Sequence, residues 1–142
     1  MTEQDLIKTA RSVVDAFNDN DWDRFGSLMT PNALYNEVGT QRRLQGVAEI
    51  SQGLQSWKEA MPDVKGTVTN AFANTDRAVL EVTWEGTHTG PLAGPGGTIP
   101  ASGKRQVTHS AWVFHVDGDR IKESRNYFDM LSLLQQLGAL PN

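Results

Sequence analysis

The spacing of apolar residues changes near Pro62, and this change constrains the fold more than any other feature of the sequence. Before Pro62, except in residues 33–38, apolar residues recur three or four positions apart, as on one face of a helix. After it they recur at every second position, as on one face of a strand. Helices that come first and strands that come later are typical of an α+β domain, with the helices packed on one face of a bent antiparallel sheet.

Four segments show helical spacing. The first follows Thr2 or Asp5, either of which is suited to cap it, and ends at the polar run 18–21. A short second helix is expected to reach Met29 and to be stopped by Pro31. Residues 46–61 form the third helix and residues 130–137 the last, which Gly138 can close.

Five segments are predicted as strands, with one long loop between the third and the fourth. The strands are residues 33–38, 64–72, 78–88, 104–116 and 120–129. Residues 74–76 and 117–119 are predicted as turns, and residues 89–102 as a mobile loop, because Gly and Pro are dense there. No linker divides the chain, so residues 1–142 are expected to form one domain.

Charge and composition exclude several classes of function. The net charge is -4 and no stretch gathers Lys and Arg, so we expect no nucleic-acid partner. There is no Cys, which excludes disulfides and thiolate catalysis. The three His and the carboxylates show no metal-ligand spacing, so neither a metal nor another cofactor is expected. No apolar run has membrane-spanning length and no signal peptide is visible, so we expect a cytoplasmic protein without a membrane partner.

Five short motifs in the second half resemble those of the SnoaL-like polyketide cyclases. They are residues 84–90 (WEGTHTG), 102–104, 117–121, 127–129 (YFD) and 136–138. This family is similar to ketosteroid isomerases, scytalone dehydratase and limonene epoxide hydrolase, which share the fold of nuclear transport factor two. The resemblance implies a cone-shaped curved antiparallel sheet, N-terminal helices on its concave face and an enclosed apolar pocket. It also implies a homodimer.

The same resemblance suggests catalytic residues. Asp129 matches the aspartate that SnoaL-like cyclases use as acid and base, and His88 matches a histidine of their GTHTG segment. Glu37 falls near the catalytic base of ketosteroid isomerases, but Val13 stands where those enzymes carry an oxyanion-binding tyrosine. Limonene epoxide hydrolase needs an arginine from a central strand, which here offers Glu81 and Thr83, so epoxide hydrolysis is disfavoured.

Asp129 and two histidines are therefore the predicted catalytic residues. Asp129 precedes an apolar helix, where desolvation would make it a usable proton acceptor; the alternative is that it only caps that helix. His109 would lie beside Asp129 if residues 117–119 form a three-residue turn with a bulge, whereas a two-residue turn would place it on the opposite face. Its alternative is a solvent-facing histidine. His88 is expected at the rim of the pocket, where it either contacts substrate or anchors the loop.

Five further residues are predicted to bind substrate: Tyr35, Glu37, Trp84, Trp112 and Tyr127. Tyr35 could donate a hydrogen bond to an oxyanion and Glu37 could be a second base. For Glu37 we favour the other interpretation, a strand edge with the carboxylate in water. Trp84 and Trp112, with Trp57, are expected to form an aromatic wall that suits a flat substrate.

The first functional hypothesis is a cofactor-independent cyclase or isomerase that moves a proton next to a carbonyl of a small apolar, cyclic substrate. The second is a non-catalytic module that holds a small hydrophobic molecule or forms dimers, since one fold serves many functions. The third is a dehydratase or hydrolase on the same scaffold.

Overall fold

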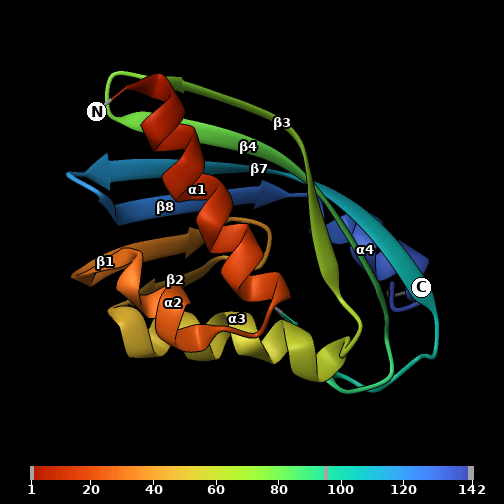
Figure 1. Ribbon diagram of the computed structural model, residues 1–142. Helices are drawn as coiled ribbons and strands as arrows, with labels where there is room; N and C mark the ends of the chain where they lie inside the picture. Colours follow the sequence, from red (N-terminus) through yellow and green to blue (C-terminus); the bar gives the residue numbers. More distant parts are fainter. Residues whose placement is uncertain (1, 95, 141–142) are drawn as a thin grey trace.

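The computed structural model describes residues 2–94 and 96–140, which form an α+β fold with a strongly curved sheet (Figure 1). The helices are α1 (Glu3–Asn18), α2 (Trp22–Ser27), α3 (Val47–Ala60) and α4 (Met130–Gln136). The strands are β1 (Met29–Glu37), β2 (Arg42–Gln45), β3 (Lys65–Asn74), β4 (Arg77–Thr87), β5 (Leu92–Gly94), β6 (Gly97–Ile99), β7 (Arg105–Asp117) and β8 (Arg120–Phe128). The predicted fold class is confirmed.

Six strands form the main sheet in the order β2-β1-β8-β7-β4-β3. The strands that follow one another in sequence pair antiparallel, but β1 pairs with β8 in parallel. The prediction of a purely antiparallel sheet is therefore wrong at this pair. Parallel neighbours require a long crossover between them, and here the chain from β2 to β7 supplies it.

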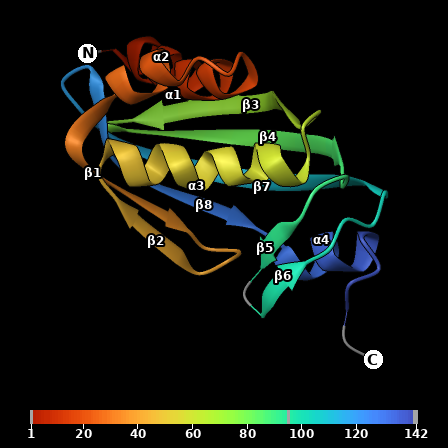
Figure 2. The same cartoon turned by 90° about the horizontal axis from the view of Figure 1, so that it is seen from below.

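The alternation predicted for the later strands is present and separates the core from the outside. In β7 the even positions from Gln106 to Val116 are buried, and most odd positions are exposed or half-buried. Helices α1 and α3 lie on the same side of the sheet, with α1 across β3 and β4 and α3 along the lower part (Figures 1 and 2). The core side of the sheet therefore faces these two helices.

The helix termini follow local sequence signals. Thr2 caps α1 in a capping box with Asp5, so the first of the two predicted caps is the correct one. The second helix ends at Ser27, not Met29, because Met29 already begins β1. Pro31 lies inside β1, in a stretch where the ladder with β8 is interrupted between Met29 and Leu34. A proline without an amide hydrogen is tolerated there because no ladder bond is lost.

Two short hairpins were not expected. Strand β2 folds back on β1, and β5 pairs with β6 inside the predicted loop 89–102, in which residue 95 lies outside the described residues. The turn between β7 and β8 also differs from the prediction. Asp117 pairs with Arg120 across a two-residue turn, and the register then shifts between His115 and Val116. Beyond that shift, odd-numbered residues of β7 pair with odd-numbered residues of β8, as they would after a three-residue turn.

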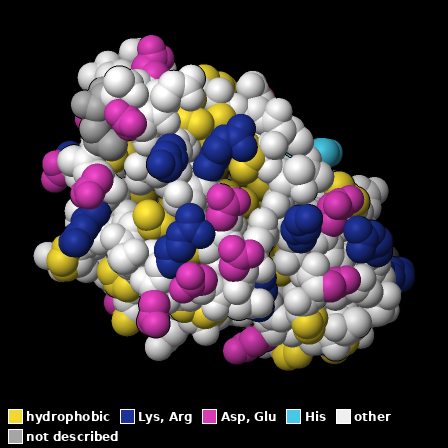
Figure 3. All heavy atoms as spheres, viewed as in Figure 1, with side chains coloured by type: hydrophobic (Ala, Val, Ile, Leu, Met, Phe, Trp, Pro, Cys, Tyr) yellow, Lys and Arg dark blue, Asp and Glu magenta, His cyan; other side chains and the backbone are white. Residues whose placement is uncertain are grey.

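The helix-bearing face of the molecule carries basic and acidic side chains that are interspersed (Figure 3). Among the described residues no helix is both long and apolar enough to cross a membrane.

Candidate active site

A cavity lies among the helices and the core side of the sheet, with a mostly apolar wall. Its volume is about 60 Å³, enough for a few water molecules but less than most ligand sites. The aromatic side chains in the wall are Phe17, Tyr35, Trp57, Trp84, Trp112 and Phe128, and the polar ones besides Tyr35 are Glu37, Gln106, Thr108 and Asn126. Half-buried Trp57 and Phe128 contact each other edge to face, so a larger ligand would have to move such side chains.

Glu37 is the charged residue of this wall, and it is fully buried at the end of β1. One carboxylate oxygen, Oε1, accepts a hydrogen bond of 2.6 Å from the Thr40 hydroxyl and one of 3.0 Å from Arg42 Nε. Arg42 Nη2 lies 2.9 Å from the same oxygen and completes an ion pair. The cost of burying the carboxylate is therefore offset by an opposite charge and by direct hydrogen bonds.

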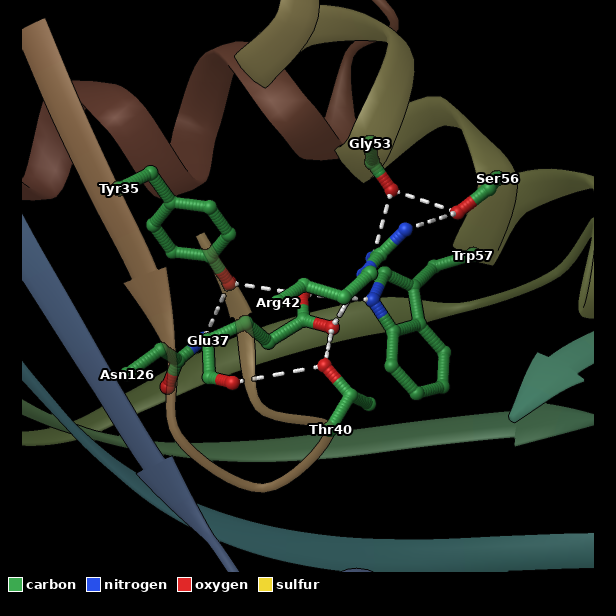
Figure 4. A network of polar contacts seen from close by, with 8 residues as sticks. All are labelled: Tyr35, Glu37, Thr40, Arg42, Gly53, Ser56, Trp57 and Asn126. Carbon is green, nitrogen blue, oxygen red and sulfur yellow. Dashed lines mark hydrogen bonds and ion pairs between the residues drawn. The ribbon is translucent and has the colours of Figure 1, made fainter. Parts of the chain in front are cut away.

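The second oxygen of Glu37 faces two aromatic donors (Figure 4). Tyr35 Oη donates to Oε2 at 2.9 Å, and Trp57 Nε1 donates to it at 3.0 Å. The Tyr35 oxygen in turn accepts a hydrogen bond of 3.3 Å from Asn126 Nδ2. Burial, followed by the negative charge of Glu37, raises the pKa of Tyr35 well above its ordinary value. Tyr35 is therefore protonated, and its hydroxyl donates a hydrogen bond to the carboxylate.

Arg42 reaches Glu37 because β2 folds back directly on β1. The two residues are opposite one another in the ladder. Arg42 is also fixed from α3, since Nη2 donates to the Gly53 carbonyl at 3.1 Å and Nη1 to Ser56 Oγ at 3.4 Å. A Cβ at Gly53 would meet the methyl end of the Leu44 side chain, so α3 and β2 are in close contact at this position.

Four of the predicted substrate-binding residues line the cavity: Tyr35, Glu37, Trp84 and Trp112. The interpretation of Glu37 as a carboxylate in water is wrong, because β2 covers β1 and the side chain has no exposed surface. Tyr127 is not part of the wall. It is 43% exposed on the outer face of β8, and its neighbours Asn126 and Phe128 line the cavity instead.

Asp129 does not line the cavity. It is exposed and caps α4, where its Oδ1 accepts a hydrogen bond of 3.1 Å from the amide of Ser132. The expectation of a desolvated carboxyl inside the pocket is therefore corrected, and the geometry is that of the capping alternative. Asn126 and Phe128 of β8 line the cavity and Tyr127 does not, so a continued strand would also have directed Asp129 away from the cavity.

His109 also lies outside the cavity, on the outer face of β7. It is exposed, and its Nδ1 lies 3.1 Å from the hydroxyl of Thr83 on β4. Beyond the bulge, residues of equal parity in β7 and β8 face the same side of the sheet, as predicted for a turn with a bulge. The odd-numbered positions, however, face outward and not toward the cavity. Even-numbered positions of β7 face the core, so the odd-numbered His109 faces away from it.

His88 is fully buried, and it anchors the segment that follows β4. Its Nδ1 accepts a hydrogen bond of 3.1 Å from the amide of Ser102 and lies 2.9 Å from the hydroxyl of the same residue. Burial lowers the pKa of His88, while backbone hydrogen bonding with Gly90 and Ile99 opposes this effect. His88 does not line the cavity, so the loop-anchoring alternative matches its geometry.

Sequence reasoning missed Thr40, Arg42 and Asn126. Arg42 and Thr40 belong to a hairpin with no clear alternation, so nothing in the sequence placed them beside Glu37. Asn126 could have been found, because it has the same parity as the apolar Phe128 in the predicted strand 120–129. Within residues 2–94 and 96–140 no three His, Asp or Glu side chains are grouped as metal ligands would be.

Comparison with known proteins agrees with this architecture. The sequence model of the SnoaL-like polyketide cyclases matches residues 7–137. A search of curated proteins gives no match.

Solved structures with the same fold are distant in sequence. A candidate SnoaL-like polyketide cyclase from Jannaschia sp. CCS1 superposes with a TM-score of 0.86 at 20% identity, covering 98% of this chain and 95% of its own. A protein of ketosteroid isomerase-like fold from Catenulispora acidiphila, in complex with trimethylamine, gives 0.79 at 19%, covering 94% and 93%. An M. tuberculosis epoxide hydrolase gives 0.73 at 19%, covering 95% and 90%. Identities this low show the fold alone.

Proposed function

The chain belongs to the SnoaL-like polyketide cyclase family, and from this premise we propose that it is a cofactor-independent cyclase or isomerase. It moves a proton next to a carbonyl of an apolar cyclic substrate bound in the cavity. The single observation that carries this proposal is the hydrogen-bonded pair of Tyr35 and Glu37 in the cavity wall. A carboxylate held in an apolar wall is a group suited to acid and base chemistry.

Tyr35 is the member of the pair through which the proton passes. A phenolic oxygen has one hydrogen to donate and two lone pairs; it donates to Glu37 and accepts from Asn126, which leaves one lone pair for substrate. The substrate C–H transfers its proton to this oxygen as the original Tyr35 proton moves to Glu37. The products are an enolate, a neutral Tyr35 and a protonated Glu37. The proton returns along the same route to another atom in an isomerisation, or to the oxygen of a newly formed aldol in a cyclisation.

The high pKa of Tyr35 is compatible with this route because no tyrosinate accumulates. Tyr35 remains neutral before and after the transfer, and the charge moves from Glu37 to the substrate. Arg42 stays within 2.9 Å of the Glu37 carboxylate and holds it in position. Arg42 is thus a positioning residue in the proposal.

Proton exchange provides a test that does not require the natural substrate. 2-Tetralone is an apolar cyclic ketone, and its uptake of deuterium from D2O reports proton removal next to the carbonyl. The wild-type protein is expected to accelerate this exchange, and Glu37→Gln and Tyr35→Phe should each lose about 100-fold or more of the acceleration. The exchange is measured by NMR, with circular dichroism to verify that each variant is folded.

Asp129→Asn is the matched control for that experiment, because Asn also caps helices. This variant should accelerate deuterium exchange into 2-tetralone at the wild-type rate, whereas the family resemblance alone would predict that it is inactive. If Glu37→Gln accelerated the exchange as much as the wild type, the assignment of Glu37 as the base would be contradicted. No exchange in any variant, wild type included, would contradict proton transfer in this cavity.

A second candidate, a non-catalytic binding module, is favoured by one feature of Glu37. Both of its oxygens already have two or more donors within 3.0 Å, as expected of a carboxylate with a structural role. The exchange experiment distinguishes the enzyme from the binding module, because a binding module would bind 2-tetralone without accelerating its exchange.

The outer face of the sheet supports a further proposal, a homodimer. Phe72 pairs with Val79, and Val79 pairs with Val113, so these three apolar side chains form a row across β3, β4 and β7. Phe72 is 53% exposed. A second copy of the chain would cover this row and remove apolar surface from water.

A further inference from the structure

Two residues of the cavity wall each carry a buried polar atom that has no hydrogen-bond partner within residues 2–94 and 96–140. They are the indole nitrogen Nε1 of Trp112 and the amide oxygen Oδ1 of Asn126. Trp112 is 1% exposed and Asn126 is 7% exposed, and both residues line the cavity. Leaving a buried donor or acceptor unpaired costs free energy, so native proteins nearly always satisfy such groups with protein, water or ligand.

The two residues are neighbours across two strands. Trp112 of β7 and Asn126 of β8 are directly opposite in the antiparallel ladder. Side chains at such a pair point to the same face, with Cβ atoms about 5 Å apart. An unpaired donor and an unpaired acceptor therefore belong to adjacent residues of the cavity wall.

The hydrogen-bond network determines which way the Asn126 amide is turned. Glu37 can only accept, so the Tyr35 hydroxyl must give its one hydrogen to the carboxylate. Asn126 must then present its NH2 group to the Tyr35 oxygen (Figure 4). The opposite orientation would place two acceptors together. The amide oxygen is therefore the free atom of Asn126, and the acceptor character of this position follows from the protein alone.

The Trp112 ring is also held in place. Its centroid lies 4.8 Å from that of Phe114, 5.9 Å from Tyr35 and 6.2 Å from Trp84. An indole enclosed by three aromatic rings does not rotate freely in a packed core. Its N–H is thus a donor at a fixed place rather than one that can turn toward another partner.

We propose that Trp112 and Asn126 form a subsite for a hydroxyl group on the bound ring, namely a phenol or the enol form of a cyclic ketone. A hydroxyl accepts from Trp112 Nε1 and donates to Asn126 Oδ1 at once. A carbonyl would satisfy only Trp112, and an ammonium group only Asn126. The aromatic side chains around the subsite suit a flat ring as the carrier. This inference rests on the proposed function for the identity of the ring, but the subsite itself is defined by the two unpaired atoms.

Ligand binding tests the subsite with three probes that share one ring system: 2-naphthol, 2-methoxynaphthalene and naphthalene. Only 2-naphthol both donates and accepts a hydrogen bond. Wild-type protein is expected to bind 2-naphthol at least about tenfold more tightly than either of the others. Dissociation constants are measured by isothermal titration calorimetry near neutral pH, where 2-naphthol is uncharged.

Two variants connect this preference to the subsite. Trp112→Phe removes the N–H and keeps an aromatic ring, and its preference for 2-naphthol should fall to about threefold or less. Asn126→Leu removes the acceptor and should lower the preference in the same way, which keeps the test decisive if Trp112→Phe does not fold. Equal wild-type affinities for the three probes, no binding of 2-naphthol, or an unchanged preference in a folded variant would overturn the proposal.

Failure of the subsite and failure of the proposed reaction give different results. Preference for 2-naphthol without deuterium exchange into 2-tetralone would retain the subsite and reject the reaction. Exchange that depends on Glu37, with no preference among the three probes, would retain the reaction and reject the subsite.

Discussion

Among single residues, Glu37 is the one whose surroundings differ most from a surface carboxylate. It is fully buried, and its ion pair with Arg42 is the contact that neutralises its charge. The other donors are neutral groups, which stabilise a charge but do not cancel it. The free energy of unfolding should therefore depend strongly on Arg42.

Arg42→Met should lower the free energy of unfolding by about 2 kcal/mol. Loss of one partner from a buried ion pair costs about 3–5 kcal/mol, and the Arg42 side chain, at 28% exposure, is partly screened by water. Arg43→Met, at the exposed neighbouring position of β2, should change the free energy of unfolding by less than about 0.5 kcal/mol. Urea unfolding measures both, and equal losses would show that Glu37 does not need the charge of Arg42.

His88 should make stability depend on pH. Burial lowers its pKa in the folded protein below the value of 6.5 for the free side chain. As pH falls below about 6.5 the unfolded chain binds a proton that the folded protein does not, so stability decreases. The carboxylates with lowered pKa, such as Asp63 and Asp76, act only at more acidic pH.

The measurement is the thermal midpoint between pH 7 and pH 5 for the wild type and for His88→Gln. The midpoint of the wild type should fall over this range, and that of His88→Gln should fall less. Parallel curves would assign the pH dependence to other groups.

At the scale of elements, local sequence signals are sufficient to predict some helices and strands but not others. Helix α1 begins at the capping box of Thr2 and Asp5, which is readable from four consecutive residues. Strands β4 and β7 follow a clear alternation over 11 and 13 residues. Strand β2 has only four residues and exists because β1 offers it an edge.

Helix α4 should depend on Asp129 as a cap rather than as a catalytic group. Asp129→Ala should lower the free energy of unfolding by about 1 kcal/mol, because the Ser132 amide loses its acceptor. Asp129→Asn should cost only a few tenths of a kcal/mol. Chemical denaturation compares them, and equal stability of all three proteins would exclude the capping role.

The segment after β4 docks on the end of α3 through a close backbone contact. The amide of Gly90 donates to the Ala60 carbonyl at 3.0 Å, and a side chain at residue 90 would clash with the backbone of Glu59. Gly90→Ala should therefore lower the free energy of unfolding by about 1–3 kcal/mol. Gly96→Ala, where a Cβ meets nothing within 4 Å, is the control and should be close to neutral in thermal denaturation.

At the scale of the whole molecule, the proposed homodimer predicts a change in mass. Val113→Arg places a charge in the middle of the apolar row formed with Phe72 and Val79. Sedimentation analysis should show a dimer for the wild type and a monomer for this variant. Lys122→Glu, on the exposed part of β8, should remain dimeric. A wild-type monomer would reject the interface.

The sequence by itself determined the order of the main helices and strands and the alternation along β4 and β7, because both follow from local periodicity and from the cost of exposing apolar side chains. It also identified the aromatic wall and Tyr35. It did not determine that Asp129 and His109 lie outside the cavity, or that Glu37 lies inside it. Those positions depend on the bulge in β8, on the parallel pairing of β1 with β8 and on the return of β2. Each of these brings together residues far apart in the chain, and only the tertiary structure decides such contacts.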